Sequence, residues 1–96
     1  GYILVARMTT PLDLCSDKVW QAEQRLVHRL QDEFSTETTG TELRAWLTTY
    51  DFDLLSDYRA RWKGWFSGCQ VACRVFWHFE GESEIARFIS GECTDN

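Results

Sequence analysis

The sequence predicts an α+β domain in which an antiparallel sheet, including a hairpin over residues 58–80, packs on a long helix. Two patterns predict this class. Residues 58–80 alternate between apolar and polar positions in a way that closes into one hairpin, and residues from about 12 to 34 repeat apolar side chains at helical spacing. Four cysteines add two expected disulfides. The alternative is an all-α bundle stapled by the same disulfides, because residues 54–79 also show an apolar stripe at helical spacing.

The first two expected elements are a strand and a long helix. Residues 2–9 (YILVARMT) have strand propensity, with a loose alternation of side chains. Thr10 suits an N-cap, Pro11 suits the first helical position, and the helix dipole favours Asp13 in the first turn. We therefore predict a helix over about 12–34. The apolar residues at helical spacing are Val19, Trp20, Leu26, Val27, Leu30 and Phe34.

A second, shorter helix is expected after the hydroxyl-rich linker STETTGT at 35–41. Thr39 and Glu42 have the spacing of a capping box. We expect the residues Tyr50-Asp51-Phe52-Asp53 to end this helix, with a further turn through Leu54 and Leu55. Its apolar positions are Leu43, Trp46, Leu47 and Tyr50.

The hairpin is predicted from one register that satisfies both strands. Closing a two-residue turn at Ser67-Gly68 places only apolar-face residues opposite one another, and a slip of one residue would destroy this agreement. The same register places the basic residues Arg61 and Arg74 opposite each other on the other face. After Gly81, the run ESEIARFIS predicts a short helix with its apolar side chains inward. The pairs in the apolar row are Phe66–Cys69, Gly64–Val71, Trp62–Cys73, Ala60–Val75 and Tyr58–Trp77.

The predicted hairpin restricts the disulfide pairing. Cys69 and Cys73 lie four residues apart on one strand, so their Cα atoms would be about 13 Å apart, whereas a disulfide requires less than about 7 Å. One of them is expected to pair with Cys15 and the other with Cys93, and both such pairings remain open. The spacing lacks paired C-x-x-C knuckles, so we expect disulfides and no metal site.

The composition and charge limit which class of protein this chain can belong to. The 96 residues are 44% hydrophobic and 15% aromatic, which predicts one folded domain over 1–96. The net charge of −5 argues against nucleic-acid binding. The first residues, GYILVARMTT, are too short for a membrane span and lack the flanks of a signal peptide. Together with disulfides, this predicts an extracellular protein, secreted or part of an ectodomain.

The layout resembles the SEA module, an extracellular domain of mucins and membrane-anchored proteases. The resemblance covers about residues 2–80 in layout, and in motif it rests on WFSGCQVACRVFWHF with its turn at Gly68. It implies a helix-backed antiparallel sheet, with YILVARMTT as its first strand. Some members of that family cleave themselves after the turn glycine, but Cys69 follows here in place of serine, and an oxidised thiol could not attack.

A distinctive basic and aromatic surface is expected on the outer face of the hairpin. Residues 58–79 carry four basic residues and no acidic one. Aromatic residues beside arginine are enriched at interaction sites. We hypothesise a binding surface, although the same residues would also keep a sheet face soluble. Its members are Arg59, Arg61, Lys63, Trp65, Arg74 and Phe76.

These features predict a non-enzymatic extracellular interaction module. Its expected partner is a protein or an acidic extracellular ligand such as a sulfated glycan. The alternative is a small secreted ligand or effector, resembling a toxin or a pheromone. We expect no catalysis and no cofactor, because no nucleophile motif occurs and His28 and His78 have no evident catalytic partner. The acidic run Asp51, Asp53 and Asp57 lacks the glycine and the final Glu of an EF-hand loop.

Overall fold

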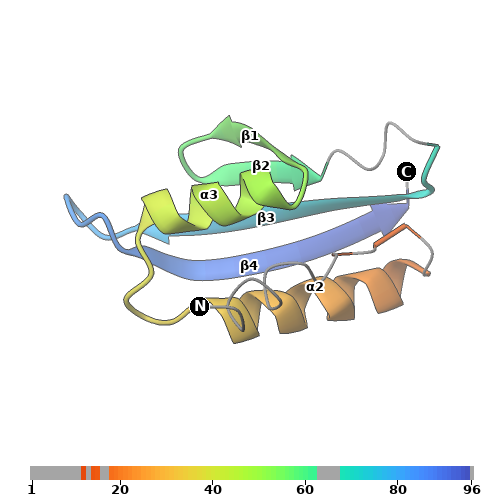
Figure 1. Ribbon diagram of the computed structural model, residues 1–96, viewed down its shortest axis with the longest axis horizontal. Coiled ribbons are helices and arrows are strands. Elements are labelled where there is room, and N and C mark those ends of the chain that lie inside the picture. Colours follow the sequence, from red (N-terminus) through yellow and green to blue (C-terminus); the bar gives the residue numbers. More distant parts are fainter. Residues whose placement is uncertain (1–11, 13, 16–17, 63–67, 96) are drawn as a thin grey trace, which may run out of the picture.

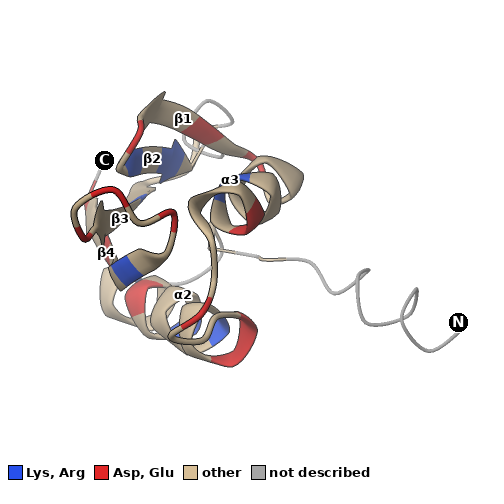
Figure 2. Ribbon diagram, turned by 90° about the vertical axis from the view of Figure 1, so that its left-hand side faces the viewer, with Lys and Arg blue, Asp and Glu red and all other residues tan. Residues whose placement is uncertain are grey.

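The computed structural model is a four-stranded antiparallel sheet with two helices on one face (Figures 1 and 2). It describes residues 12, 14–15, 18–62 and 68–95. The strand order is β1-β2-β3-β4, a simple meander. The α+β class is therefore confirmed, and the all-α alternative is wrong. The predicted strand at 2–9 lies outside the described residues. In chain order, the elements are α2 (Val19–Glu33), α3 (Gly40–Thr49), β1 (Phe52–Ser56), β2 (Arg59–Trp62), β3 (Val71–Phe79) and β4 (Ala86–Asp95).

The helix predicted over about 12–34 is shorter than expected. α2 begins at Val19 and has 15 residues. Leu12 and Leu14 are both buried in the core although neither is helical, and burial of two residues two positions apart is the pattern of extended chain. Lys18 is also extended, and its N–H donates to Gln21 Oε1 at 3.2 Å. The described residues before α2 are therefore not helical, and the helix starts at Val19.

The predicted second helix is confirmed together with its cap. α3 begins after the N-cap Thr39, whose Oγ1 accepts from the Glu42 backbone N–H at 3.2 Å. In return, Glu42 Oε1 accepts from the Thr39 N–H at 3.4 Å. Leu43 and Leu47 are fully buried, as their spacing predicts. This helix could be predicted because all its signals are local in sequence.

The predicted turn through Leu54 and Leu55 is wrong, because these residues belong to strand β1. The chain leaves α3 through Asp51, which has a positive φ of 69°. Phe52 is then buried directly opposite Trp62 of β2. This contact between strands, which no local propensity encodes, makes the segment extended.

The hairpin register is confirmed where both strands are described. Ala60 lies opposite Val75 and Arg61 opposite Arg74, as predicted. The Trp77 N–H donates to the Tyr58 carbonyl at 3.1 Å, which continues the same register. Strand β2 ends at Trp62, and Ser67 of the predicted turn lies outside the described residues. Gly68 has a φ of 81°, a left-handed conformation that glycine adopts without steric cost.

The predicted short helix after Gly81 is wrong, because residues Ala86–Asp95 form β4, the longest strand of the sheet. A bulge explains the helix-like spacing. The pairing of β3 with β4 shifts between Phe76 and His78, because β4 has one extra residue there. Ala86 and Ile89 of β4 therefore both contact the core although they are three residues apart. A strand with one extra residue therefore has the apolar spacing of a helical turn.

The disulfides join Cys15 to Cys69 and Cys73 to Cys93. Their Cα–Cα distances are 5.4 and 4.1 Å. The prediction that Cys69 and Cys73 do not pair with each other is confirmed, and the structure selects one of the two pairings that the sequence left open. The second bridge joins residues directly opposite each other on β3 and β4. The first bridge ties Cys15, which precedes α2, to Cys69, which lies just before β3.

The core lies between the helices and one face of the sheet. α2 contributes Leu26 and Leu30, which lie so close to β4 that a Cβ on Gly91 would come within 2.8–3.0 Å of their side chains. The two helices meet where Phe34 packs edge-on against Trp46, at 5.2 Å between ring centroids. The opposite sheet face is left without a helix of the described chain over it (Figure 2).

Candidate functional site: the open face of the sheet

The sheet face opposite the helices, here called the open sheet face, carries a row of four charged residues. Directly opposed residues of neighbouring strands lie on the same face, so the register links one residue from each strand. Asp53 of β1 lies opposite Arg61 of β2, Arg61 lies opposite Arg74 of β3, and Arg74 lies opposite Glu92 of β4. Across the four strands the charges therefore run negative, positive, positive, negative.

A second row lies next to this charged row. Arg59 of β2 lies opposite Phe76 of β3, and Phe76 lies opposite Ser90 of β4. Arg59 is exposed and Phe76 is half-buried. This row places an apolar ring directly beside an arginine on the same face. The predicted association of basic and aromatic side chains is thus realised for the part of the hairpin that the structure describes.

The cations of the open sheet face differ in their partners. Arg74 is exposed, as is Arg59, and neither makes a hydrogen bond or an ion pair with any described residue. Arg61 is half-buried and does make interactions. Arg87 of β4 lies opposite His78, and its Nε is 3.1 Å from Glu80 Oε2. Among the described cations of this face, Arg59 and Arg74 are consequently the two without an ionic partner in the described part of the chain.

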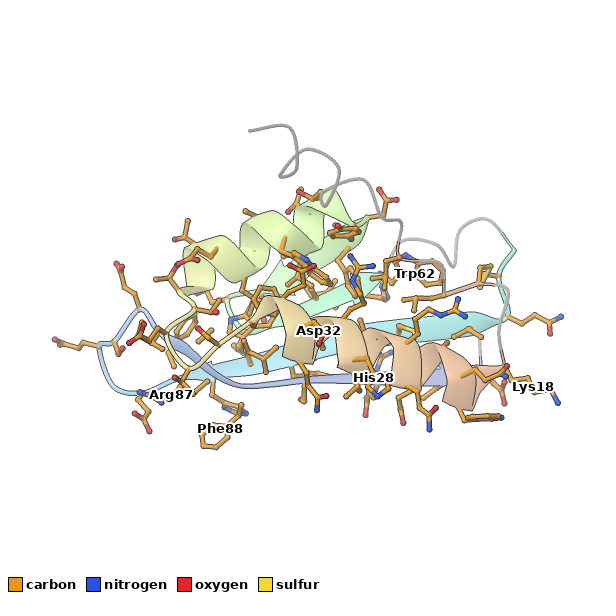
Figure 3. The ribbon with its side chains drawn as sticks, turned by 60° about the horizontal axis from the view of Figure 1, so that its bottom comes forward. Lys18, His28, Asp32, Trp62, Arg87 and Phe88 are labelled. Atoms are coloured by element: carbon orange, nitrogen blue, oxygen red, sulfur yellow. A yellow bond between two sulfur atoms is a disulfide. The ribbon has the colours of Figure 1, made fainter. Side chains whose placement is uncertain are left out.

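Phe88 stands out at the bulge of β4. Its φ is 55°, a left-handed conformation that bulky residues rarely adopt, and 74% of its surface is exposed. Its ring contacts the ring of His78 edge-on, at 6.1 Å between centroids. Figure 3 shows Phe88 beside Arg87, with its ring directed away from the core. An exposed aromatic ring held in an unfavourable backbone conformation is a candidate contact residue.

Of the six predicted binding residues, four lie together on the open sheet face and two cannot be placed. Lys63 and Trp65 lie outside the described residues. The structure adds four members to this set, and it places Glu92, one of the acidic residues near the C-terminus that the sequence suggests could lie near the arginines and offset their charge, directly opposite Arg74. The four members belong to strands that were predicted as helical turns, so only a correct strand assignment, from alternation about the bulge, could have found them. The added residues are Asp53, Arg87, Phe88 and Glu92.

A groove lies beside the outer edge of β4, next to the second half of α2. It has a volume of about 620 Å³, and its apolar lining includes Val27, Leu30, Phe34, Phe88 and Ile89. A groove of this size can hold a small ligand. Its lining is mostly apolar, with Arg87 and Glu80 at one end already paired with each other.

Both ends of the β4 edge are already occupied by other parts of the chain. The Ala86 N–H donates to the Thr38 carbonyl at 2.8 Å. The Cys93 N–H donates to Glu23 Oε1 of α2 at 3.0 Å. Only the backbone between these two points faces the groove, so a long strand could not add to this edge without displacing a hydrogen bond.

Groups that could act in catalysis or bind metals are scattered over the described part of the chain. His78 contacts Phe88 on the open sheet face, and His28 is exposed on α2. Figure 3 shows His28 on the outer side of that helix, near Asp32. Within the described residues no group of three or more His, Cys, Asp or Glu side chains could hold a metal ion.

Comparisons with protein-family models, curated proteins and solved structures found no match. The resemblance to the SEA module therefore stays a prediction. Neither described helix is long and apolar enough to cross a membrane. The proposal below consequently depends on the geometry and chemistry of the open sheet face.

Proposed function

We propose that this chain is a non-enzymatic extracellular interaction module that binds an acidic partner through the open sheet face. One observation carries the proposal. The face carries the exposed cations Arg59 and Arg74, which have no ionic partner among the described residues, in a chain whose net charge is −5. An anion is the ligand that such a surface favours.

The opposed pair Arg61 and Arg74 supports binding over simple solubility. Like charges directly opposite each other on neighbouring strands are destabilising. Two lysines or arginines at separate positions would keep the face soluble without this repulsion. An anionic ligand beside Arg74, which has no ion pair among the described residues, would offset this repulsion.

The extracellular location is supported by the two disulfides. Disulfides persist in oxidising compartments and are rare in the cytosol. They also join the segments around the open sheet face. Cys73 lies immediately before Arg74 in the chain, and Cys93 follows Glu92. A bridge between β3 and β4 at this point fixes the two strands that carry half of the charged row.

The proposal is tested by mapping where anions bind. Heparin fragments and short peptides rich in glutamate would be titrated into isotopically labelled protein, and amide shifts followed by NMR. We expect the largest shifts at residues of the open sheet face around Arg59, Arg61 and Arg74. Shifts confined to the helices, or the same response from every surface, would contradict the proposal.

A matched pair of variants sharpens this test. Replacing Arg59 and Arg74 together by Ser should abolish most of the anion-induced shifts while leaving the spectrum of the folded protein intact. The control replaces Lys18 and Arg44, on the helical side, by Ser, and changes the net charge by the same amount. Equal loss of binding in both variants would show a general charge effect and would exclude a site on the open sheet face.

A further inference from the structure

We infer that the free edge of strand β1 binds an extended segment of a partner protein in which apolar and cationic side chains alternate. β1 is the first strand in the sheet order, so only one of its sides pairs with a described strand, β2. Figure 1 shows β1 as the outermost strand, on the side of the sheet away from α2. This edge is a different surface from the open sheet face, so the inference goes beyond the proposed function.

The direction of the backbone groups in β2 follows from one hydrogen bond. In an antiparallel ladder, successive residues direct their N–H and C=O groups alternately toward one neighbouring strand and toward the other. The Tyr58 carbonyl, just before β2, accepts from the Trp77 N–H of β3 at 3.1 Å. Arg61, three residues later, therefore directs its backbone groups toward β1.

The free edge of β1 consequently presents the backbone groups of Phe52 and Leu54. Asp53 lies opposite Arg61, so the backbone groups of Asp53 are directed toward β2 and those of its two neighbours are directed outward. Neither Phe52 nor Leu54 makes a further backbone hydrogen bond within the described part of the chain. Such an edge is a template for pairing with another extended chain.

Exposed apolar side chains gather at the same edge. Five large apolar side chains are exposed among the described residues, and three of them belong to β1 and the turn that follows it. These three are Leu54, Leu55 and Tyr58. A cluster of exposed apolar side chains marks an interaction surface, whereas a single one needs no explanation.

The charge around this edge favours a cationic partner. β1 and the residues directly beside it contain three acidic side chains and no basic one. Asp51 and Asp57, at the two ends, are exposed and make no ion pair with a described residue. Arg44 lines the same pocket as Asp57, but Glu82 and Glu84 line it too, so acidic side chains outnumber basic ones there. Both ends of the strand therefore attract cationic groups.

The two faces of β1 give the bound segment its alternating pattern. Directly opposed residues of paired strands lie on the same face. A partner residue opposite Leu54 meets an exposed apolar side chain, whereas the next partner residue, opposite Asp53, meets a carboxylate. Arg61 lies on the other side of Asp53 and offsets part of its charge, so Asp51 and Asp57 supply most of the attraction.

A second copy of this chain is a poorer occupant of the edge. Two β1 strands that pair through both outward residues place Phe52 of one copy opposite Leu54 of the other. This register sets the two Asp53 side chains directly opposite each other, and like charges in that position are destabilising. The acidic residues that disfavour self-pairing thus favour a cationic segment from another protein.

The test compares labelled peptides by fluorescence anisotropy at physiological salt. The first alternates Lys and Val, and the second alternates Glu and Val. The third is the Lys/Val peptide with two adjacent central amides N-methylated, which blocks hydrogen bonding on both of its edges. We expect the first to bind roughly tenfold more tightly than either of the others, because each of them loses charge complementarity or hydrogen bonds. Equal affinities of the first and third peptides, or tighter binding of the second, would overturn the inference.

A proline at the edge tests strand pairing directly. Leu54→Pro removes an outward N–H, and an edge strand tolerates proline where its N–H faces solvent, so the circular dichroism spectrum should keep the sheet. Affinity for the Lys/Val peptide should fall roughly tenfold. Leu54→Ala is the control, because it keeps the N–H and should weaken binding less. Equal affinities of the two folded variants would contradict pairing at this edge.

Variants of the acidic residues test the charge argument. Replacing Asp51 and Asp57 together by Asn should weaken binding of the Lys/Val peptide several-fold. The control replaces Asp32 by Asn and Glu37 by Gln, which are exposed outside the sheet, and changes the net charge equally. An equal loss of affinity in both variants would show a general charge effect and would exclude a site at β1.

NMR mapping separates this site from the open sheet face. The Lys/Val peptide should shift the amides of Phe52 and Leu54 most, and it should still bind the Arg59→Ser/Arg74→Ser variant. A failure of anions to bind the open sheet face would leave both results unchanged. Peptide-induced shifts confined to that face would refute the site at β1. Shifts of β1 amides with protein concentration, without peptide, would identify a second copy as the occupant and refute the cationic partner.

Discussion

At the scale of single residues, close packing between a helix and the sheet occurs where α2 lies on β4. Gly91 has no side chain, and the space that a Cβ would need is filled by Leu26 and Leu30. Both leucines are buried, so neither can move away into solvent. The sequence alone did not identify Gly91 as special, because the position of the helix over the strand is set by the tertiary fold.

Replacing Gly91 by Ala should destabilise the protein by about 1–3 kcal/mol, the usual cost of overpacking a core. The new Cβ would lie 2.8 Å from Leu26 Cδ2 and 3.0 Å from Leu30 Cδ1. Urea denaturation measures the change. Ser90→Ala is the control, since Ser90 is exposed and such substitutions usually stay within about 0.5 kcal/mol. Equal midpoints for the two variants would show that α2 does not pack this closely on β4.

Phe88 is expected to lower the stability of the free protein while providing a contact for the partner. Its left-handed φ is unfavourable for a bulky residue, by roughly 1–2 kcal/mol. Asn tolerates this conformation better, so Phe88→Asn should leave the stability unchanged or raise it by up to about 1 kcal/mol. Thermal unfolding gives the stability change. The same variant should bind the acidic peptides more weakly. A clear loss of stability would indicate that the ring has a structural role.

At the scale of elements, the predictions were right where the deciding contacts join residues close in the sequence, and wrong where they join residues far apart. α3 was predicted with its cap because Thr39 and Glu42 contact each other within one turn. The predicted start of the first helix was wrong because Leu14 is buried outside the helix and Cys15 is bonded to Cys69, which is 54 residues away. Strand β4 was missed because its bulge mimics helical spacing.

Each disulfide should contribute several kcal/mol to the stability of these elements. The bridges span 54 and 20 residues, for which the chain-entropy model gives about 4 and about 3 kcal/mol. Cys15→Ala/Cys69→Ala and Cys73→Ala/Cys93→Ala should each lower the free energy of unfolding by such amounts in denaturant titrations. Peptide mapping without reduction checks that each variant keeps its other bridge. In the unsubstituted protein, a bridge between Cys15 and Cys93 in the same mapping would contradict the fold.

At the scale of the whole molecule, neither described helix covers the second face of the sheet. Circular dichroism should therefore show a helical fraction well below one half, because the described helices have only 15 and 10 residues. The contribution of the aromatic side chains must be subtracted from the circular dichroism spectrum, since the chain has five Trp. A helical fraction above one half would contradict the four-stranded sheet and would support the all-α alternative.

The hairpin register was the most accurate long-range prediction for the whole molecule. It succeeded because two alternating strands joined by a short turn have few registers, and only one buries every apolar residue. It places Arg61 opposite Arg74, and the structure has the same pair. The candidate site was therefore predictable in part: the register placed the central arginines, whereas the positions of Asp53 and Glu92 opposite them depend on strands that were not predicted.

The sequence by itself determined the α+β class, the hairpin register, the cap of α3 and the exclusion of a Cys69–Cys73 bridge. These depend on side-chain alternation and on contacts between residues close in the chain. Only the tertiary structure decided where α2 begins, that residues 86–95 form a strand, and which bridges form. Each of these depends on burial against, or bonding to, residues far away in the sequence. The outer members of the charged row, Asp53 and Glu92, belong to that second class, because their place depends on strands that form only in the assembled sheet.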